Sequence, residues 1–393
     1  MNKRSIRNAD VAGKTVLVRV DFNVPMRDGV ISDDSRIRAA LPTLNLLREN
    51  GAKVVVCSHF GRPKGQVIES MRLGEVRKRL SELLEVPVAD AGGPNGDQPL
   101  KVVSTLQAGE FALLENLRFE SGEESNSDEF SGHLASLADL YVNDAFGAAH
   151  RAHASTAGVA AHLPAYAGLL MERELEMLGS SLEGSTGATI AIVGGAKVAD
   201  KIQVLRHLAQ KVDTILVGGG MVAAFFVAQG KSGGAAEVTD EDAAAARGLL
   251  EAGGANVVLP ADVITAPEFA EDSPPTVCDS SDVPTNGLIL DIGPRSAKEY
   301  SRIISLVDTI IWNGPMGVFE WPEFAKGSVA VAKAVASNKK ATSVIGGGST
   351  AEIVGSLDLV DMITHVSTGG GASLEFLEGK TLPGVAALDD VSN

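Results

Sequence analysis

The fold is decided by stretches such as TIAIVGGAKVADKI, residues 189–202, in which an apolar run ends abruptly at two glycines. The run TIAIV is rich in β-branched residues and carries no charge, which is typical of a strand buried on both faces of a parallel sheet. The residues after the glycines predict a helix, with Lys197 and Lys201 one turn apart on one face. A strand, a glycine turn and a helix form the unit from which α/β folds are built.

The same pattern recurs along the chain of 393 residues. In the first half we predict strands at 16–23, 53–59, 111–117 and 140–146. In the second half we predict them at 189–195, 214–219, 256–263, 288–293, 309–314, 342–348 and 365–371. The intervening segments have helical apolar patterns, so we expect an α/β fold of parallel sheets covered by helices on both faces. Ligands of such sheets bind beyond the carboxyl ends of the strands.

Length and one helical segment predict two domains. A chain of 393 residues exceeds the roughly 250–300 residues at which single cores stop growing. The segment AGLLMERELEMLGSSL, residues 167–182, has a helical apolar pattern and precedes a polar break at 183–187. We interpret it as a hinge helix that joins an N-terminal domain, 1–166, to a C-terminal domain, 183–376. The remaining segment, 377–393, is apolar enough to dock on one of them.

Composition excludes several classes of function. The net charge of −16 argues against nucleic acid or an anionic membrane as a partner. No apolar run approaches the ~20 residues that span a bilayer, and the N-terminal residues form no apolar signal core, so we expect a cytoplasmic protein. The two cysteines, Cys57 and Cys278, are too few for a disulfide framework and are expected to be buried, reduced thiols.

Basic residues of the first half lie at or just after predicted strand ends. They are Arg36, His59, Arg62, Arg118, His150, Arg151 and His153. Converging guanidinium groups would hold a small polyanion, because their forks match phosphate and carboxylate. Any one of them alone could equally be a solvated surface charge, and for Arg38 we favour a structural role.

Asp21 and Asn23, in the motif RVDFNVP, face the same side of their strand. They could bind a substrate hydroxyl or could merely stabilise the turn before Pro25.

The second half has features of a nucleotide-phosphate site. It contains neither GxxxxGK[ST] nor a GxGxxG that follows a strand, so neither a P-loop nor a dinucleotide fold is supported. Lys197, Lys201 and a helix start after two glycines would instead bind phosphate. The motif IGGGST at 345–350 offers backbone N–H groups and two hydroxyls at another helix start. In WNGPMGVFE, residues 312–320, Glu320 suits a ribose diol, although it could be a solvated loop residue.

At these residues the chain resembles the phosphoglycerate kinases. The motifs that carry the resemblance follow the family's order over essentially the whole chain: RVDFNVP (19–25), SHFGRP (58–63), LLENLRF (113–119), AHRAHAS (149–155), GGAKVADKI (194–202), VGGGM (217–221), LPADV (259–263), DIGP (291–294), WNGPMGVFEW (312–321) and STGGGASLEFLEGKTLPGV (367–385). The resemblance implies two Rossmann-like domains, with the segment 377–393 returning to the N-terminal one. It also implies a monomer that transfers a phosphoryl group between ATP and the carboxylate of 3-phosphoglycerate in glycolysis.

The resemblance also implies roles for single residues. The 3-phosphoglycerate site would comprise Asp21, Asn23, Arg36, His59, Arg62, Arg118 and Arg151. The nucleotide site would comprise Lys197, Lys201, Gly219, Glu320, Gly347, Gly348, Ser349 and Thr350. The catalytic groups would be Arg36 and Lys197, one from each half, with the backbone of Gly369 and Gly370 facing the transferred group.

One position departs from the family. The nucleotide turn usually reads GGGD, with the aspartate as Mg²⁺ ligand, whereas this chain has Ser349 there. A neutral hydroxyl is a poorer ligand for Mg²⁺ than a carboxylate. The cofactor expectation is therefore Mg²⁺ with ATP or ADP as substrate, with Ser349 as a doubtful metal ligand.

Three functions remain open at this stage. A kinase that acts on a carboxylate needs no general base, only in-line positioning, charge neutralisation and closure of the two domains. A non-catalytic paralogue that binds nucleotide or phosphoglycerate would follow from the loss of the metal ligand. A sugar kinase would need an acid as base, for which Asp21 is available, but the arginines suit an anionic acceptor better.

Overall fold

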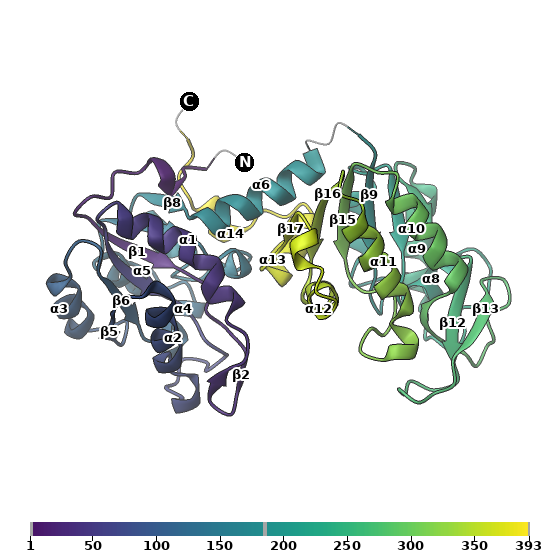
Figure 1. Cartoon of the computed structure of the whole chain (residues 1–393), viewed down its shortest axis with the longest axis horizontal. Coiled ribbons are helices and arrows are strands. Elements are labelled where there is room, and N and C mark those ends of the chain that lie inside the picture. Colours follow the sequence, from purple (N-terminus) through teal and green to yellow (C-terminus); the bar gives the residue numbers. More distant parts are fainter. Residues whose placement is uncertain (1–2, 184–186, 392–393) are drawn as a thin grey trace. The chain divides into compact units, whose positions relative to one another are not determined.

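Figure 1 shows the computed structural model, which describes residues 3–183 and 187–391. The chain divides into two compact units. Unit 1 contains the residues up to Glu176 and those from Thr381 onward, and unit 2 runs from Met177 to Lys380. The division falls inside the helix α6 (Leu169–Glu183).

The core of unit 1 is a parallel sheet of six strands in the order β5-β6-β4-β1-β7-β8. Its strands are β1 (Thr15–Arg19), β4 (Lys53–Cys57), β5 (Val88–Gly92), β6 (Phe111–Leu114), β7 (Leu140–Asn143) and β8 (Ala165–Ala167). Val16 and Val18 pack with the helices α1 (Ser35–Glu49) and α2 (Gly74–Leu84) in one apolar cluster. Leu17, which points to the opposite face, is also buried. Both faces of the sheet are therefore covered, which explains the unbroken apolar runs in its strands.

The helices of unit 1 follow its strands. They are α1 (Ser35–Glu49), α2 (Gly74–Leu84), α3 (Asp97–Thr105), α4 (Ser121–Glu124), α5 (Asp128–Ala135) and α14 (Pro383–Ala386). A short hairpin, β2 (Met26–Arg27) with β3 (Val30–Ile31), precedes α1.

The last part of the chain lies in unit 1 beside its beginning (Figure 1). The backbone N–H of Arg4 donates to the carbonyl of Asp389 at 2.8 Å, and Lys3 pairs with Asp390 at 2.8 Å. In α14, the N–H of Gly384 donates to the carbonyl of Ala149 at 2.8 Å. These contacts tie the C-terminal segment to the first described residues of the chain and to the loop that follows β7.

Unit 2 repeats the architecture, with a parallel sheet in the order β11-β10-β9-β15-β16-β17. Its strands are β9 (Thr189–Val193), β10 (Thr214–Val217), β11 (Asn256–Val258), β15 (Thr309–Asn313), β16 (Thr342–Gly346) and β17 (His365–Val366). Its helices are α7 (Ile202–Leu208), α8 (Val222–Ala228), α9 (Asp240–Glu251), α10 (Pro294–Ile304), α11 (Lys326–Ser337), α12 (Gly348–Ser356) and α13 (Gly370–Leu377). The predicted α/β fold with two helix-covered parallel sheets is confirmed.

One predicted strand, 288–293, and the second part of another, 256–263, belong to a different sheet from the one predicted. The run 256–263 is two strands, because β11 ends at Val258 and β12 (Asp262–Ala266) begins after Pro260. Proline lacks the N–H that a continuing strand would donate. β12 pairs antiparallel with β13 (Thr276–Asp279) and with β14 (Leu288–Ile292), which lies inside the predicted run 288–293. The three strands form a separate small sheet in the order β13-β12-β14.

In the part of the chain that the structure describes, no helix combines the length and apolar character needed to span a membrane.

Candidate active site

Basic side chains gather where the strands of unit 1 end. Arg19 is the last residue of β1, His59 follows β4, and Arg118 lies in the turn after β6. Arg36 belongs to the first turn of α1, and Arg151 follows β7. Carboxyl ends of parallel strands share one edge of a sheet, so the fold brings these side chains together.

The environment of His59 demonstrates this convergence. Burial lowers the pKa of its imidazole well below the ordinary 6.5. Nearby guanidinium groups lower it further, namely those of Arg19, Arg118, Arg151 and Arg36. Burial and the charges of Arg118, Arg19 and Arg151 lower the pKa of His153 to about 4. A cluster that keeps its histidines neutral by positive charge is suited to bind an anion.

Asp21 and Asn23 hold parts of this cluster in place. Arg36 donates from Nη1 to Asp21 Oδ2 at 3.2 Å and to the carbonyl of Asn23 at 3.1 Å. The side-chain oxygen of Asn23 accepts from the N–H of Gly61 at 2.9 Å. The sequence allowed two roles for Asp21 and Asn23, turn stabilisation and substrate binding. In this structure both residues make turn-stabilising contacts.

The remaining arginines differ in burial and in whether they already have hydrogen-bond partners. Arg118 is 2% exposed and donates to the carbonyl of Gly61 at 2.7 Å. Burial and the charge of Arg151 lower its pKa to about 10. Arg151 donates to Nε2 of His150 at 3.2 Å. Arg62 is exposed and makes no hydrogen bond or ion pair within the described residues, so its guanidinium is available to a ligand.

Sequence reasoning missed two buried charged residues beneath this cluster. Arg19 and Glu123 are both 0% exposed, and the hydroxyl of Ser155 contacts both. An arginine inside the otherwise apolar run VLVRV was the available signal, because a strand buries a charge only where a partner compensates it.

Unit 2 has a cavity of about 340 Å³ beside its glycine turns. Of the predicted nucleotide residues, Gly219, Glu320 and Ser349 line it. Its other walls are mainly apolar and include Phe269, Leu288, Val318 and Phe319. Gly219 has φ 72°, and a Cβ there would lie 2.5 Å from the carbonyl oxygen of Gly195, so this close approach requires glycine.

The predicted start of the helix, directly after Gly194 and Gly195, is wrong. α7 begins only at Ile202, and Lys197 lies in a loop. The reason is that neighbouring turns use the backbone groups of the two glycines: Gly194 donates to the carbonyl of Asn313 at 3.1 Å, and the carbonyl of Gly195 accepts from Met221 at 3.0 Å. The two lysines therefore do not share a helix face.

The two lysines differ in environment. Lys197 is exposed and has no partner among the described residues. Lys201 is half-buried, which lowers its pKa, and it donates to the side-chain oxygen of Asn313. Asn313 was missed by the sequence reasoning. Its amide nitrogen is buried without a hydrogen-bond partner in the described residues, so a donor remains unused at the end of β15.

The glycine runs at 346–348 and 369–371 do begin helices. Gly348 opens α12 and Gly370 opens α13, and a Cβ on Gly370 would lie 4.0 Å from the backbone nitrogen of Gly348. Helix N-termini present unpaired N–H groups and partial positive charge, so two adjacent ones favour phosphate. Ser349, in the first turn of α12, is exposed at the cavity.

Thr350 does not face the cavity. It is 0% exposed, and its hydroxyl oxygen accepts from the N–H of Gly314 at 2.7 Å. Its place in the structure is therefore beneath the loop 314–317, of which Pro315 and Gly317 line the cavity.

The donor set around this cavity does not by itself make a metal site. No group of three or more His, Cys, Asp or Glu side chains suited to a metal occurs in the described residues. Glu320 is the carboxylate that lines the cavity, and the first turn of α12 offers the hydroxyl of Ser349. Mg²⁺ usually binds through one or two carboxylates together with substrate phosphates, so the protein's own contribution here is small.

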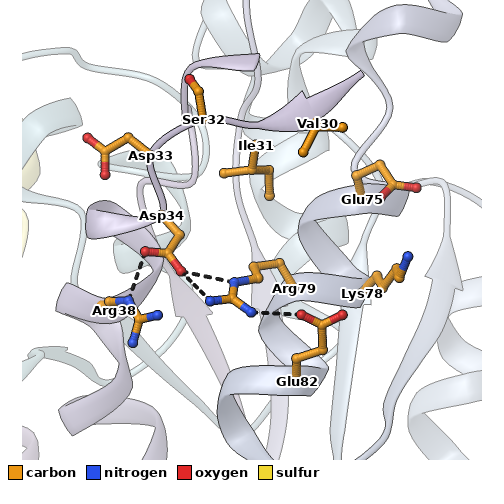
Figure 2. Close-up of a pocket in the computed structure, with 10 residues that line it drawn as sticks. All are labelled: Val30, Ile31, Ser32, Asp33, Asp34, Arg38, Glu75, Lys78, Arg79 and Glu82. Atoms are coloured by element: carbon orange, nitrogen blue, oxygen red, sulfur yellow. Dashed lines mark hydrogen bonds and ion pairs between the residues drawn. The ribbon is translucent and has the colours of Figure 1, made fainter. Parts of the chain in front are cut away.

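A second cavity, of about 620 Å³, lies in unit 1 between the β2–β3 hairpin and α2 (Figure 2). Asp34 accepts there from Nε of Arg38 at 2.8 Å and from Nε of Arg79 at 2.9 Å. Arg79 also donates to Glu82 at 2.7 Å. The predicted structural role of Arg38 is thus confirmed, and none of the predicted site residues lines this cavity.

Comparison with known proteins agrees with this geometry. The family model described as phosphoglycerate kinase matches residues 6–380. The chain is similar to the structure of phosphoglycerate kinase from Coxiella burnetii, with 40% sequence identity, a TM-score of 0.89 and 98% of each chain covered. It is also similar to the phosphoglycerate kinase from Pyrococcus horikoshii OT3, with 34% identity, a TM-score of 0.84 and 98% of each chain covered. The chain belongs to the phosphoglycerate kinase family.

Proposed function

We propose that this chain transfers a phosphoryl group reversibly between ATP and the carboxylate of 3-phosphoglycerate, giving 1,3-bisphosphoglycerate and ADP. We assign it to glycolysis in the cytoplasm, as a monomer that uses Mg²⁺ with its nucleotide. The observation that supports this assignment best is the cluster of guanidinium groups around His59, because such a cluster would bind a polyanion without nucleotide character.

The acceptor site would use the groups that remain available at the cluster. Arg62 has an unused guanidinium, and Arg118 and Arg151 contribute positive charge around His59. Asp21 and Asn23 fix Arg36 and the Gly61 loop, so their contribution to binding is partly indirect. A phosphate and a carboxylate on one small molecule would be neutralised together by such a set.

The nucleotide would occupy the cavity in unit 2. Its apolar walls suit a base, Glu320 suits the ribose hydroxyls, and the N-termini of α12 and α13 suit the phosphates. Lys197 and Lys201 would add positive charge to those phosphates. Bound Mg²⁺ would neutralise phosphate charge, held mainly by the nucleotide itself and weakly by Ser349.

The chemical step needs no proton transfer to the protein. A carboxylate acceptor is ionised at neutral pH, so catalysis reduces to in-line positioning and stabilisation of the charge on the moving group. We assign its equatorial oxygens to Arg36 and Lys197, and to the backbone N–H groups of Gly369 and Gly370. Because these groups belong to different units, we also propose that the units close when both substrates are bound, which would exclude water from the acyl phosphate.

A coupled assay tests this function. The protein is mixed with ATP, Mg²⁺ and 3-phosphoglycerate, and acyl phosphate is reduced by glyceraldehyde-3-phosphate dehydrogenase with loss of NADH absorbance. We expect loss of absorbance that requires both substrates. Calorimetric binding of ADP and 3-phosphoglycerate without turnover would instead support a non-catalytic paralogue, the alternative that Ser349 raises.

A further inference from the structure

A continuous chain of hydrogen bonds lies buried beneath the basic cluster of unit 1. Arg19 donates from Nε to the hydroxyl oxygen of Ser155 at 2.8 Å. Ser155 donates in turn to Glu123 Oε1 at 2.6 Å, and its backbone N–H donates to Glu123 Oε2 at 3.0 Å. At the other end of the chain, Nη2 of Arg19 lies 3.1 Å from Nδ1 of His59. Arg19, Ser155 and Glu123 are 0% exposed, so water does not compete for these bonds.

The contact between Arg19 and His59 fixes where the imidazole carries its proton. A guanidinium has only donors, so Nδ1 of His59 must accept and cannot hold a proton. The neutral ring then carries its proton on Nε2. An imidazolium is excluded as well, because it would place a second donor against Arg19.

The other groups that face His59 agree with this assignment. Its positive neighbours Arg36, Arg118 and Arg151 all disfavour a charged ring. The acid nearby is Asp21, whose Oδ1 lies 3.9 Å from the same Nδ1, beyond hydrogen-bond distance. That carboxylate is bonded to Arg36 instead. In the described residues Nε2 of His59 has no hydrogen-bond partner and is not among the fully enclosed unsatisfied atoms, so its N–H keeps some access to solvent although the residue is only 6% exposed.

Glu123 determines the orientation of the Ser155 hydroxyl, at the end of the hydrogen-bond chain away from His59. By accepting the hydroxyl proton of Ser155, it leaves the oxygen lone pair of that serine for Arg19. The phenol of Tyr141 anchors Ser155 further, by donating to its carbonyl at 2.7 Å. Burial raises the pKa of Glu123, and the nearby charge of Arg19 and the hydrogen bonds from Ser155 oppose that rise.

We propose that Glu123, Ser155 and Arg19 form a positioning relay that locks His59 as the neutral Nε2–H tautomer, so that His59 serves the anion site as an uncharged donor. The donated hydrogen bond adds specificity for an oxygen at a fixed place without adding another positive charge. The use of that donor for 3-phosphoglycerate rests on the proposed function, whereas the tautomer itself does not.

Nuclear magnetic resonance of the ¹⁵N-histidine-labelled full chain tests the tautomer without any substrate. The His59 signals are identified by their absence in His59→Asn. We expect an unprotonated, pyridine-like Nδ1 and a protonated Nε2, with no titration between about pH 5 and 8. A protonated Nδ1, or titration near the ordinary pKa, would overturn the proposed tautomer of His59 even if the enzyme is active. Absence of activity together with the expected tautomer would overturn only the proposed function.

A pair of variants tests the relay. Glu123→Gln places an amide donor against Ser155, so we expect mixed His59 tautomers and a KM for 3-phosphoglycerate raised about tenfold, with kcat changed much less. Glu129→Gln makes the same chemical change at an exposed site on α5 and should leave both readouts unchanged. If Glu123→Gln does not fold, Ser155→Ala breaks the same chain. A folded variant of either kind with an unchanged His59 spectrum would refute the relay.

Discussion

Thr350→Val should destabilise unit 2 without removing a nucleotide contact. The substitution keeps the shape of the side chain but removes the acceptor of the 2.7 Å bond from the N–H of Gly314. Both residues are buried, so the N–H would be left without a partner, at a cost of about 1–3 kcal/mol. With a cost of about 2 kcal/mol and a urea slope of about 3 kcal/mol/M, the unfolding midpoint of unit 2 should fall by about 0.7 M.

The measurement is urea unfolding followed by the fluorescence of Trp312 and Trp321, which both belong to unit 2. Thr350→Ser is the matched control, because it keeps the hydroxyl and removes only a methyl group, for which about 1 kcal/mol is expected. At urea concentrations where both variants are folded, ADP affinity should stay within about threefold of the wild type in Thr350→Val as well as in Thr350→Ser, since the residue lies beneath the loop rather than at the cavity. An unchanged midpoint in Thr350→Val would refute the assigned role. A large loss of ADP affinity in Thr350→Val that Thr350→Ser does not show would restore a direct contact between the hydroxyl and the nucleotide.

The remaining predictions concern catalysis, metal, pH and closure. In steady-state kinetics, Arg36→Ala should lower kcat by a factor at least about ten times larger than the factor by which it raises KM for 3-phosphoglycerate, because its contact is assigned to the transition state. Arg38→Ala, two residues on, is the control and should have little effect on kcat or KM. Ser349→Asp should strengthen Mg²⁺-dependent ADP binding in calorimetry and lower the magnesium needed for half-maximal activity; if neither moves, Glu352 on the same helix is the next candidate ligand. Asp262→Asn should cost about 2 kcal/mol at pH 7, because the carboxylate accepts the N–H groups of Arg295 and Ser296. Burial would raise the pKa of Asp262, but hydrogen bonds from the hydroxyl of Ser296 and from the N–H groups of Ser296 and Arg295 hold it below 3.8. This stabilisation is present above pH 3.8 and is lost as the pH falls through the lowered pKa, so the urea midpoints of wild type and variant should approach each other on acidification below pH 3.8. In small-angle scattering, ADP with 3-phosphoglycerate should lower the radius of gyration more than either ligand alone, and an equal radius in all states would contradict closure.

The features that could be predicted from the sequence are those with local causes. Apolar runs such as 189–193 predict buried parallel strands, and the run IGGGST predicts the helix that begins at Gly348. The strand ends also indicated where His59 and Arg118 would lie, because carboxyl ends of parallel strands share one edge.

The features that could not be predicted from the sequence depend on contacts between residues that lie far apart along the chain. Lys197 was expected on a helix, but backbone bonds to Asn313 and Met221 hold the preceding glycines in a loop. β12 and β14 have the composition of parallel strands, and only their antiparallel pairing distinguishes them. Arg19 meets Ser155, 136 positions away, so no spacing rule along the chain could have paired them.

The return of the C-terminal segment to unit 1 has a consequence for biosynthesis. A ribosome delivers the sheet of unit 1 first, yet the partners of Arg4 and of Ala149 in this segment, Asp389 and Gly384, arrive only after all of unit 2 has been made. Unit 2 is one uninterrupted stretch and can complete its contacts while unit 1 still lacks α14. The part of the protein that is synthesised first is therefore the part that is completed last, and a nascent chain exposes the surface around Ala149 until its final residues emerge.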